Sequence, residues 1–140
     1  MSPAAPDQAP FAWPVRVYWE DTDAGGVVYH ASYLRFLERA RTEWLRAGGV
    51  DQSALRERTG LAFMVRSMEI DFLKAALLDD ELIVTVEVQE RRAASILFGQ
   101  SIRRADGTEL IRARVRVACV DLHRMAPARI PDEALPGRDP

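Results

Sequence analysis

The 140-residue sequence is poor in cysteine and has no long apolar run. The single cysteine, Cys119, cannot form a disulfide within the chain, and its apolar neighbours favour a small buried side chain. No run approaches the ~20 apolar residues that span a bilayer, and the first ten residues lack the basic and apolar regions of a signal peptide. We therefore expect a soluble, cytoplasmic protein that does not insert into a membrane.

The chain also lacks a strong excess of charge of one sign. Its formal net charge is -2 at pH 7. The composition as a whole therefore gives no attraction to nucleic acid, and binding of phosphate would need a local cluster of arginines. We expect no nucleic-acid partner.

Several kinds of site are excluded by missing motifs. The segment "DTDAGG" (21–26) begins like a calcium loop, but such a loop needs Asp or Asn at position five and Glu at position twelve, where this chain has Gly25 and Ser32. The cysteine and the two histidines have no zinc-ligand spacing. The sequence contains no serine-hydrolase elbow, Walker loop or dinucleotide fingerprint. We therefore expect no metal and no cofactor.

Both ends of the chain are rich in proline, with three prolines in the first ten residues and four in the last fifteen. Proline-rich ends are typical of segments with little regular structure. We expect flexible tails at 1–10 and 132–140, and one domain at 11–131, which is an ordinary domain length.

The first half of this domain predicts a strand and a long helix. Residues 13–19 are β-branched and aromatic, which predicts a strand that ends at Glu20. From Tyr33 onward, apolar residues recur at three- and four-residue spacing, with charged residues such as Arg41 between them. This pattern predicts an amphipathic helix of about four turns that stops at the glycine pair 48–49. A short second helical piece is expected at 51–58.

After Gly60 the apolar period changes to two, which predicts four further strands around 68–72, 82–88, 96–102 and 111–119. Their connections are too short for parallel crossovers. The predicted fold is α+β, with an antiparallel sheet of about five strands packed on one central helix. Because such a sheet leaves strand edges open, we expect an oligomer.

The candidate site is the segment "YWEDTDAGGVVYH" (18–30), which enters the long helix. Backbone N–H groups around His30 lack intrahelical partners and lie at the positive end of the helix, so they suit an oxyanion. The glycines allow a close approach of substrate, and Asp23 is placed to attack a carbonyl or activate water. Spacing alone leaves open whether Asp21 and Asp23 are instead turn or capping residues.

The stretch "RVYWEDTDAGGVVYHASYLRFLERARTEWLR" closely resembles the hotdog-fold acyl-CoA thioesterases of the 4-hydroxybenzoyl-CoA thioesterase family. Within them it is similar to the YbgC type, which is associated with the bacterial Tol-Pal envelope system. The likeness continues through "LAFMVRSMEIDF", "LLDDELIVTVEV" and "VRVACVD". The resemblance implies a sheet wrapped around a long helix, homodimers that often form homotetramers, and active sites at the dimer interface.

The resemblance also implies residue roles. Asp23 matches the catalytic carboxylate, acting as nucleophile or general base, and Asp21 then shapes the loop. His30 matches the histidine of the motif, and the N–H at that helix start polarises the thioester carbonyl. The implied substrate contacts are Gly26, Val27 and Tyr29 in the loop and, for the nucleotide end of coenzyme A, Arg91, Arg92 and Ser95.

Three functions remain open. The leading hypothesis is an acyl-CoA thioesterase that releases a free acid and coenzyme A, with acyl carrier protein as another possible partner. A hydratase or dehydratase of the same fold would carry an Asp and His pair in its own motif, which "DTDAGGVVYH" does not resemble. A non-catalytic protein of the envelope system would bind acyl-CoA or acyl carrier protein without turnover. The sequence does not define acyl chain length or a preference for aromatic acyl groups.

Overall fold

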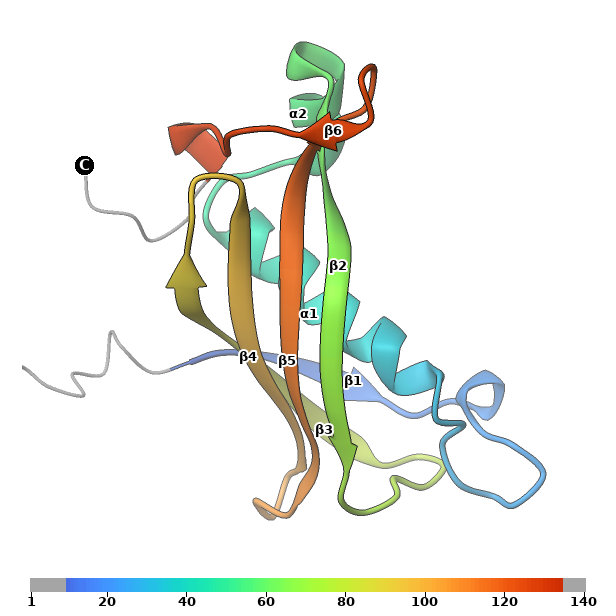
Figure 1. Cartoon of the computed structure of the whole chain (residues 1–140). Helices are drawn as coiled ribbons and strands as arrows, with labels where there is room; N and C mark the ends of the chain where they lie inside the picture. The colour runs from blue at the N-terminus through green and yellow to red at the C-terminus, as the bar shows by residue number, and fades with distance from the viewer. Residues whose placement is uncertain (1–9, 135–140) are drawn as a thin grey trace, which may run out of the picture.

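The computed structural model describes residues 10–134. Figure 1 shows one sheet curled around one long helix. The elements in chain order are β1 (Phe11–Arg16), the 3-10 helix η2 (Trp19–Asp21), α1 (Ser32–Ala47), α2 (Gln52–Thr59), β2 (Leu61–Phe72), β3 (Glu81–Arg91), β4 (Ser95–Arg104), β5 (Glu109–Asp121), β6 (Ala126–Pro127) and the 3-10 helix η3 (Asp132–Ala134).

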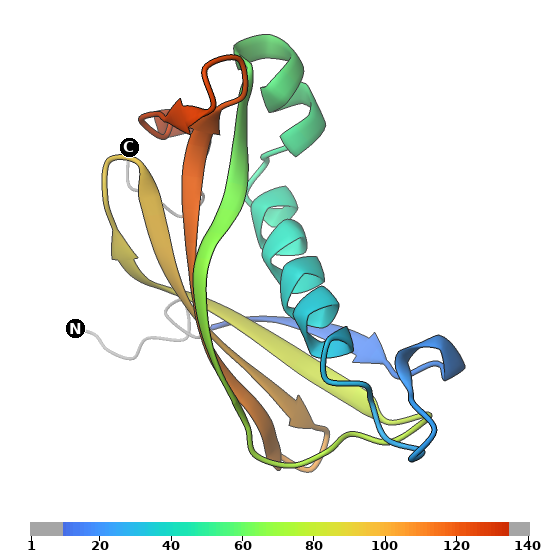
Figure 2. The ribbon, with the colours of Figure 1, turned by 45° about the vertical axis from the view of Figure 1, so that its right-hand side comes forward.

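The sheet is antiparallel throughout, and its strand order is β1-β3-β4-β5-β2, with β6 paired to β5. Successive hairpins join β3, β4 and β5, whereas β2 returns to pair with β5. Strands β1 and β2 are therefore the two edges. Turned by 45°, the ribbon shows α1 lying along the hollow side of the sheet (Figure 2). The predicted α+β fold is confirmed.

Helix α1 forms where its apolar period predicts it. Its buried apolar residues are Tyr33, Phe36, Leu37, Ala40 and Leu45. Gly48 ends the helix, because its N–H donates to the carbonyls of the preceding turn. Arg41 is the exception to the predicted polar face, since it is buried.

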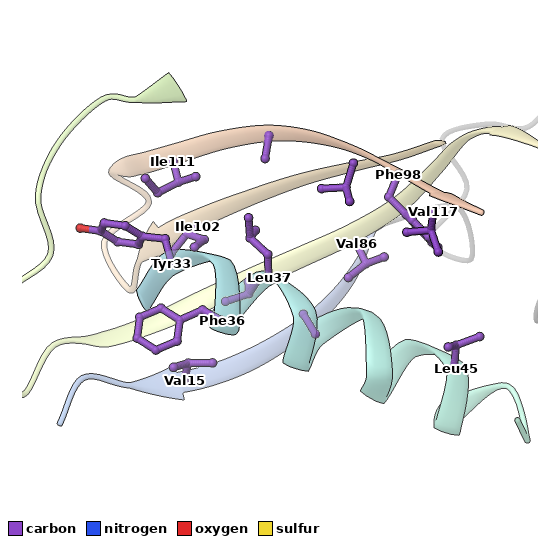
Figure 3. Packing of buried hydrophobic residues seen from close by; sticks show 14 of the residues in the cluster. Val15, Tyr33, Phe36, Leu37, Leu45, Val86, Phe98, Ile102, Ile111 and Val117 are labelled. Carbon is purple, nitrogen blue, oxygen red and sulfur yellow. The ribbon is translucent and has the colours of Figure 1, made fainter. Parts of the chain in front are cut away.

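The core lies between α1 and the inward face of the sheet. Figure 3 shows Phe36 and Leu37 of α1 among sheet residues such as Val86 and Ile102, all of them buried. Burial of each large apolar side chain contributes about 2 kcal/mol. Alternate residues of β5 point inward as predicted, from Ile111 to Cys119. This core fixes α1, and with it the loop that enters the helix.

The first strand differs from its prediction. We expected it to cover 13–19, but β1 ends at Arg16 and residues 19–21 form the 3-10 helix η2. The N–H of Tyr18 donates to Asp21 Oδ2 at 2.8 Å, and the N–H of Asp21 donates to the Tyr18 carbonyl at 3.0 Å. The carboxylate and the backbone of Asp21 thus engage the N–H and the carbonyl of Tyr18, which a strand partner would need, and this overrides the aromatic pattern.

Helix α2 begins after Asp51, whose Oδ1 accepts the N–H of Ala54 at 3.1 Å. This side-chain cap agrees with the second helical piece expected there. Among residues 10–134, neither α2 nor any other helix is long and apolar enough to cross a membrane.

The ordered chain continues through η3, where Ala134 is fully buried. The rest of the predicted tails, 1–9 and 135–140, lies outside the described residues. The division into one domain and two tails therefore stays a prediction.

Candidate active site

The loop 22–31 is a narrow hairpin at the start of α1. Thr22 pairs with Val28, and the N–H of Asp23 donates to the Val27 carbonyl at 2.9 Å. The N–H of Gly26 closes the turn on the Asp23 carbonyl at 3.0 Å. Gly26 has φ +79, in the left-handed region that favours glycine. The backbone of the loop therefore holds Asp23 near the tip of the turn.

The Asp23 carboxylate is exposed, and only one of its two oxygens accepts a hydrogen bond. Its Oδ1 accepts the N–H of Gly25 at 2.8 Å. No described residue, within 10–134, donates to its Oδ2 or pairs with it as a cation. A Cβ at position 25 would lie 3.2 Å from Oδ1, so glycine keeps this approach open. One oxygen fixes the carboxylate while the other can attack a carbon or accept a proton.

Asp21, the last residue of η2, lies next to loop 22–31 and is engaged in several hydrogen bonds. It is 3% exposed, and its carboxylate accepts the N–H of Tyr18 at 2.8 Å. Its carbonyl accepts the N–H of Tyr29 at 2.8 Å and the hydroxyl of Ser32 at 3.1 Å. These contacts tie η2 to the start of α1, and the Asp21 side chain is buried, in contrast to the exposed Asp23.

The start of α1 has no side-chain cap. Ala31 is the N-cap residue, and no side chain accepts a helix-start N–H there. In the described part of the chain, no residue accepts the N–H of His30 or Ala31. Such donors lie at the positive end of the helix, where an oxyanion is favoured. Asp23 and these donors thus belong to the same ten-residue loop.

Aromatic rings surround His30. The ring of Tyr29, an exposed residue, has its centroid 4.5 Å from that of His30, and the ring of Phe72 lies edge-on at 6.4 Å. A cavity of about 350 Å³ opens here. Its walls are Val28, His30, Tyr33, Phe72, Leu73, Lys74 and Ala75. Phe72, Tyr33 and Lys74, the only lysine of the chain, were not among the predicted site residues.

A second segment, 73–80, supports loop 22–31 through hydrogen bonds, and we call this segment the brace. The N–H of Val28 donates to the Ala76 carbonyl at 2.9 Å, and Val27 pairs with Leu77. The N–H of Ala76 in turn donates to the hydroxyl of Tyr33 in α1 at 2.9 Å. Burial raises the pKa of Tyr33, so this hydroxyl stays neutral. The middle of loop 22–31 is therefore held by residues that lie 48 to 50 positions further along the chain.

Other bonds fix the brace itself. Arg104 of β4 donates to the Ala75 carbonyl at 2.6 Å and to Asp80 Oδ2 at 3.3 Å. The same Asp80 oxygen accepts the N–H of Leu77 at 2.9 Å. Segment 73–80 is thus anchored to the sheet as well as to α1.

The turn 91–95 lies elsewhere. Ser95 is buried, and its hydroxyl accepts a hydrogen bond from Arg116 at 3.2 Å. Arg92 pairs with Glu90 at 2.9 Å, and Arg116 pairs with the same oxygen at 2.8 Å. The hydrogen bond from Arg116 is the main cause that lowers the pKa of the Glu90 carboxyl.

Arg91, Arg92 and Ser95 are not brought together with Asp23 inside one chain. Strand β3 begins beside the brace and ends at Arg91, eleven residues along. An extended strand of that length spans roughly 33 Å. Figure 1 shows loop 22–31 and the turn after β3 at opposite ends of the molecule.

The fold and the loop together define a hotdog protein with a carboxylate at the start of its central helix. Residues 17–136 match the Thioesterase-like superfamily. The chain is similar to "Acyl-CoA thioesterase YbgC" of Haemophilus influenzae, with 54% identity over 88% of this chain and 90% of that protein. It is also similar to "Acyl-CoA thioester hydrolase YbgC" of Escherichia coli, with 50% identity over 86% of this chain and 90% of that protein.

A solved structure of a probable thioesterase from Bartonella henselae has the same fold. It superposes with a TM-score of 0.83 at 36% identity, covering 88% of this chain and 100% of that one. The chain therefore belongs to the Thioesterase-like superfamily, and it is a thioesterase. The predicted resemblance to hotdog thioesterases of the YbgC type is confirmed.

Proposed function

We propose that the chain hydrolyses acyl-CoA thioesters through the loop 22–31. Asp23 delivers the attacking oxygen, either directly as a nucleophile or by deprotonating a water. The N–H groups at His30 and Ala31 then stabilise the negative charge that develops on the thioester oxygen. The observation that carries this proposal is the half-engaged Asp23 carboxylate in the same short loop as an uncapped helix start.

The chemistry suits a site with so few groups. Attack on the carbonyl breaks the carbon–sulfur bond, the thiolate of coenzyme A leaves, and one water supplies the hydroxyl of the free acid. Because thiolate is a good leaving group, the reaction needs less help from a general acid than ester or amide hydrolysis. One oxyanion donor can contribute roughly 3 kcal/mol.

Substrate contacts follow from the surroundings of this loop. The exposed Gly26 and the half-buried Val27 let the thioester approach the backbone, and the rings of Tyr29 and Phe72 provide apolar surface beside His30. The acyl group then lies toward the cavity near His30. Arg91, Arg92 and Ser95 remain the proposed contacts of the nucleotide end, supplied from a second subunit because of their distance within one chain.

This arrangement requires an oligomer. Strand β2 is an edge strand, and its apolar residues Met64 and Val65 are exposed at 42% and 48%. Such an edge is suited to pairing with a second copy. We expect light scattering after size exclusion to give the mass of a homodimer or homotetramer, and Val65→Lys to shift it toward the monomer. A monomeric wild type with full activity would contradict the two-subunit site.

The test of the catalytic role is Asp23→Asn, assayed by release of free thiol from short, long and aromatic acyl-CoAs. Removing the attacking or basic oxygen should lower kcat/KM by roughly 10²–10⁴-fold. Asp106→Asn is the matched control, because Asp106 Oδ1 also accepts an N–H two residues on, from Thr108 at 2.9 Å, in another exposed turn. This control should keep wild-type activity.

Two outcomes would redirect the proposal. Equal activity of Asp23→Asn and Asp106→Asn would remove Asp23 from the chemistry. Tight binding of acyl-CoA without turnover by the wild type would favour a non-catalytic protein that binds acyl-CoA or acyl carrier protein.

A further inference from the structure

The cavity beside His30 contains a cation that the proposed hydrolysis does not use. Lys74, an exposed residue, lines it from the start of the brace. Apart from His30, the other wall residues are apolar or aromatic, namely Val28, Tyr33, Phe72, Leu73 and Ala75. The volume is about 350 Å³. A cavity of about 150 Å³ is known to accept benzene, so this one has room for an acyl chain of about six carbons.

The backbone of Lys74 is fixed at the wall of this cavity. The N–H groups of Leu73 and Lys74 both donate to the Leu110 carbonyl of β5, at 2.8 and 3.1 Å. Phe72, the residue before them, is the last of β2. The start of the brace is therefore anchored to two strands, and the Lys74 side chain extends from a defined position.

Lys74 differs from two other cations near loop 22–31 because its ammonium has no partner. Arg35 donates to Ser32 Oγ at 2.9 Å, and Arg104 is engaged by the brace. In the part of the chain that the structure describes, no carboxylate lies within ion-pair distance of the Lys74 ammonium, and no oxygen accepts a hydrogen bond from it. The cation that lines the cavity is thus available to a ligand.

The carboxylates nearest to Lys74 in sequence are directed elsewhere. Side chains alternate between the two faces along a strand, so Asp71 and Phe72 point to opposite sides of β2. Asp71 is paired in register with Arg112 of β5. Asp80, at the end of the brace, accepts its hydrogen bonds from Arg104 and from the N–H of Leu77. A positive charge therefore stands beside an otherwise apolar wall.

We propose that Lys74 makes the site selective for acyl groups that end in a carboxylate. The inference rests on the proposed function, in which the thioester oxygen lies at the N–H groups of His30 and Ala31. The acyl chain then runs past Phe72, and its terminal carboxylate accepts hydrogen bonds from the Lys74 ammonium. The substrate class is thioesters of dicarboxylic acids of about six carbons.

The selectivity has an attractive and an unfavourable part. A terminal carboxylate gains a charge-assisted hydrogen bond, while its methylene groups pack against the ring of Phe72 and the other apolar wall residues. A purely apolar chain displaces water from the ammonium and offers no acceptor in return. The same lysine thus favours one class of acyl group and disfavours the other.

The experiment compares adipoyl-CoA with hexanoyl-CoA, which has the same number of carbons and lacks the terminal carboxylate. Release of free thiol gives kcat/KM for the wild type, Lys74→Met and Lys74→Arg. We expect the ratio of adipoyl-CoA to hexanoyl-CoA to fall about fivefold in Lys74→Met and to recover in Lys74→Arg, because an exposed ion pair contributes a modest factor. High salt should lower the ratio of the wild type toward that of Lys74→Met.

Arg124→Met is the matched control, because it removes the charge of another exposed cation. Arg124 lies between β5 and β6, at the end of the molecule opposite to loop 22–31 (Figure 1). Its ratio should equal that of the wild type. A similar fall in Arg124→Met would mean that net charge, and not the position of Lys74, sets the preference, and this would overturn the proposal.

Binding separates this inference from the catalytic proposal. Calorimetric titration of both thioesters into Asp23→Asn gives dissociation constants without turnover, and Lys74→Met in that background should again lower the preference for adipoyl-CoA about fivefold. Turnover of neither thioester by the wild type would end the catalytic proposal and leave the binding ratio as the test of Lys74. A binding ratio that Lys74→Met leaves unchanged would overturn the inference. Equal losses for both thioesters would do the same, because they would place the ammonium on the phosphates of coenzyme A.

Discussion

Loop 22–31 and turn 91–95 were both expected to contact acyl-CoA, but they differ in how far their polar side chains are already engaged. The loop is held by backbone hydrogen bonds to segment 73–80, and the Asp23 carboxylate keeps an unused oxygen. The turn is held by backbone hydrogen bonds as well, since the N–H of Arg92 donates to the Ser95 carbonyl at 2.8 Å and the N–H of Cys119 to the Ala94 carbonyl at 2.8 Å. In addition its side chains are engaged, because Ser95 accepts a hydrogen bond from Arg116 and Arg92 pairs with Glu90. The difference is therefore that the loop leaves a carboxylate oxygen available for chemistry, whereas Arg92 and Ser95 in the turn already have partners.

The sharpest way to break this comparison is to weaken the brace. Tyr33→Phe removes the acceptor of the Ala76 N–H, a buried donor that then has no partner. An unsatisfied buried group costs about 1–3 kcal/mol, so the free energy of unfolding should fall by that amount in denaturant titration. We expect kcat to fall by roughly tenfold as loop 22–31 loosens.

Two checks separate positioning from general damage in this variant. Burial raises the pKa of Tyr33 above its ordinary value of 10.0, so its hydroxyl stays protonated. The loss of activity should therefore be the same across about pH 6 to 9. Tyr18→Phe, at an exposed tyrosine, should leave kcat unchanged. A Tyr33→Phe enzyme with normal kcat would show that the brace does not position the site.

The sequence alone could single out loop 22–31 as a candidate site because its parts are contiguous. Asp23, the glycines and the helix start lie within ten residues, and each has a local physical signature. The brace, segment 73–80, has no such signature in the local sequence, because the contact between Val28 and Ala76 depends on how β2 and β3 enter the sheet. The spacing of apolar residues along the sequence does not predict tertiary contacts of this kind.

Asp21 and Arg41 show the same limit of prediction from sequence. The aromatic pattern before Glu20 favours a strand, yet the Asp21 carboxylate turns the chain into η2. Arg41 fits the polar face of an amphipathic helix by type, but its position faces Gln100 of β4 and is buried. In both cases a single side-chain partner from the folded structure decides the outcome.

A smaller effect is expected from strain in the loop. Gly26→Ala places a side chain at φ +79 with no atom within 4 Å, so the cost is conformational and not steric. Such strain costs about 1 kcal/mol or slightly more. Gly107→Ala is the matched control, with φ +93 and equally open space in the β4–β5 hairpin.

Both glycine variants should lose similar stability in thermal unfolding, but only Gly26→Ala should lose activity, by a few-fold in kcat/KM. Equal losses of activity would mean that overall stability, and not the shape of loop 22–31, limits the enzyme.

The smallest effect on activity is expected in turn 91–95. Its size decides whether that segment binds substrate at all. Arg92 is exposed and already paired with Glu90, so any bond to a coenzyme A phosphate competes with an existing one. Exposed ion pairs contribute at most about 1 kcal/mol, so Arg92→Gln should raise KM for an acyl-CoA no more than about fivefold.

The effect should vanish with the corresponding acyl-pantetheine, which keeps the thioester but lacks the nucleotide phosphates. It should also fade at high salt, because an exposed charge pair is screened. An equal rise in KM for both substrates would mean that Arg92→Gln disturbs the fold around Glu90 and Arg116. In that case the turn is part of the scaffold, and coenzyme A is held by other residues.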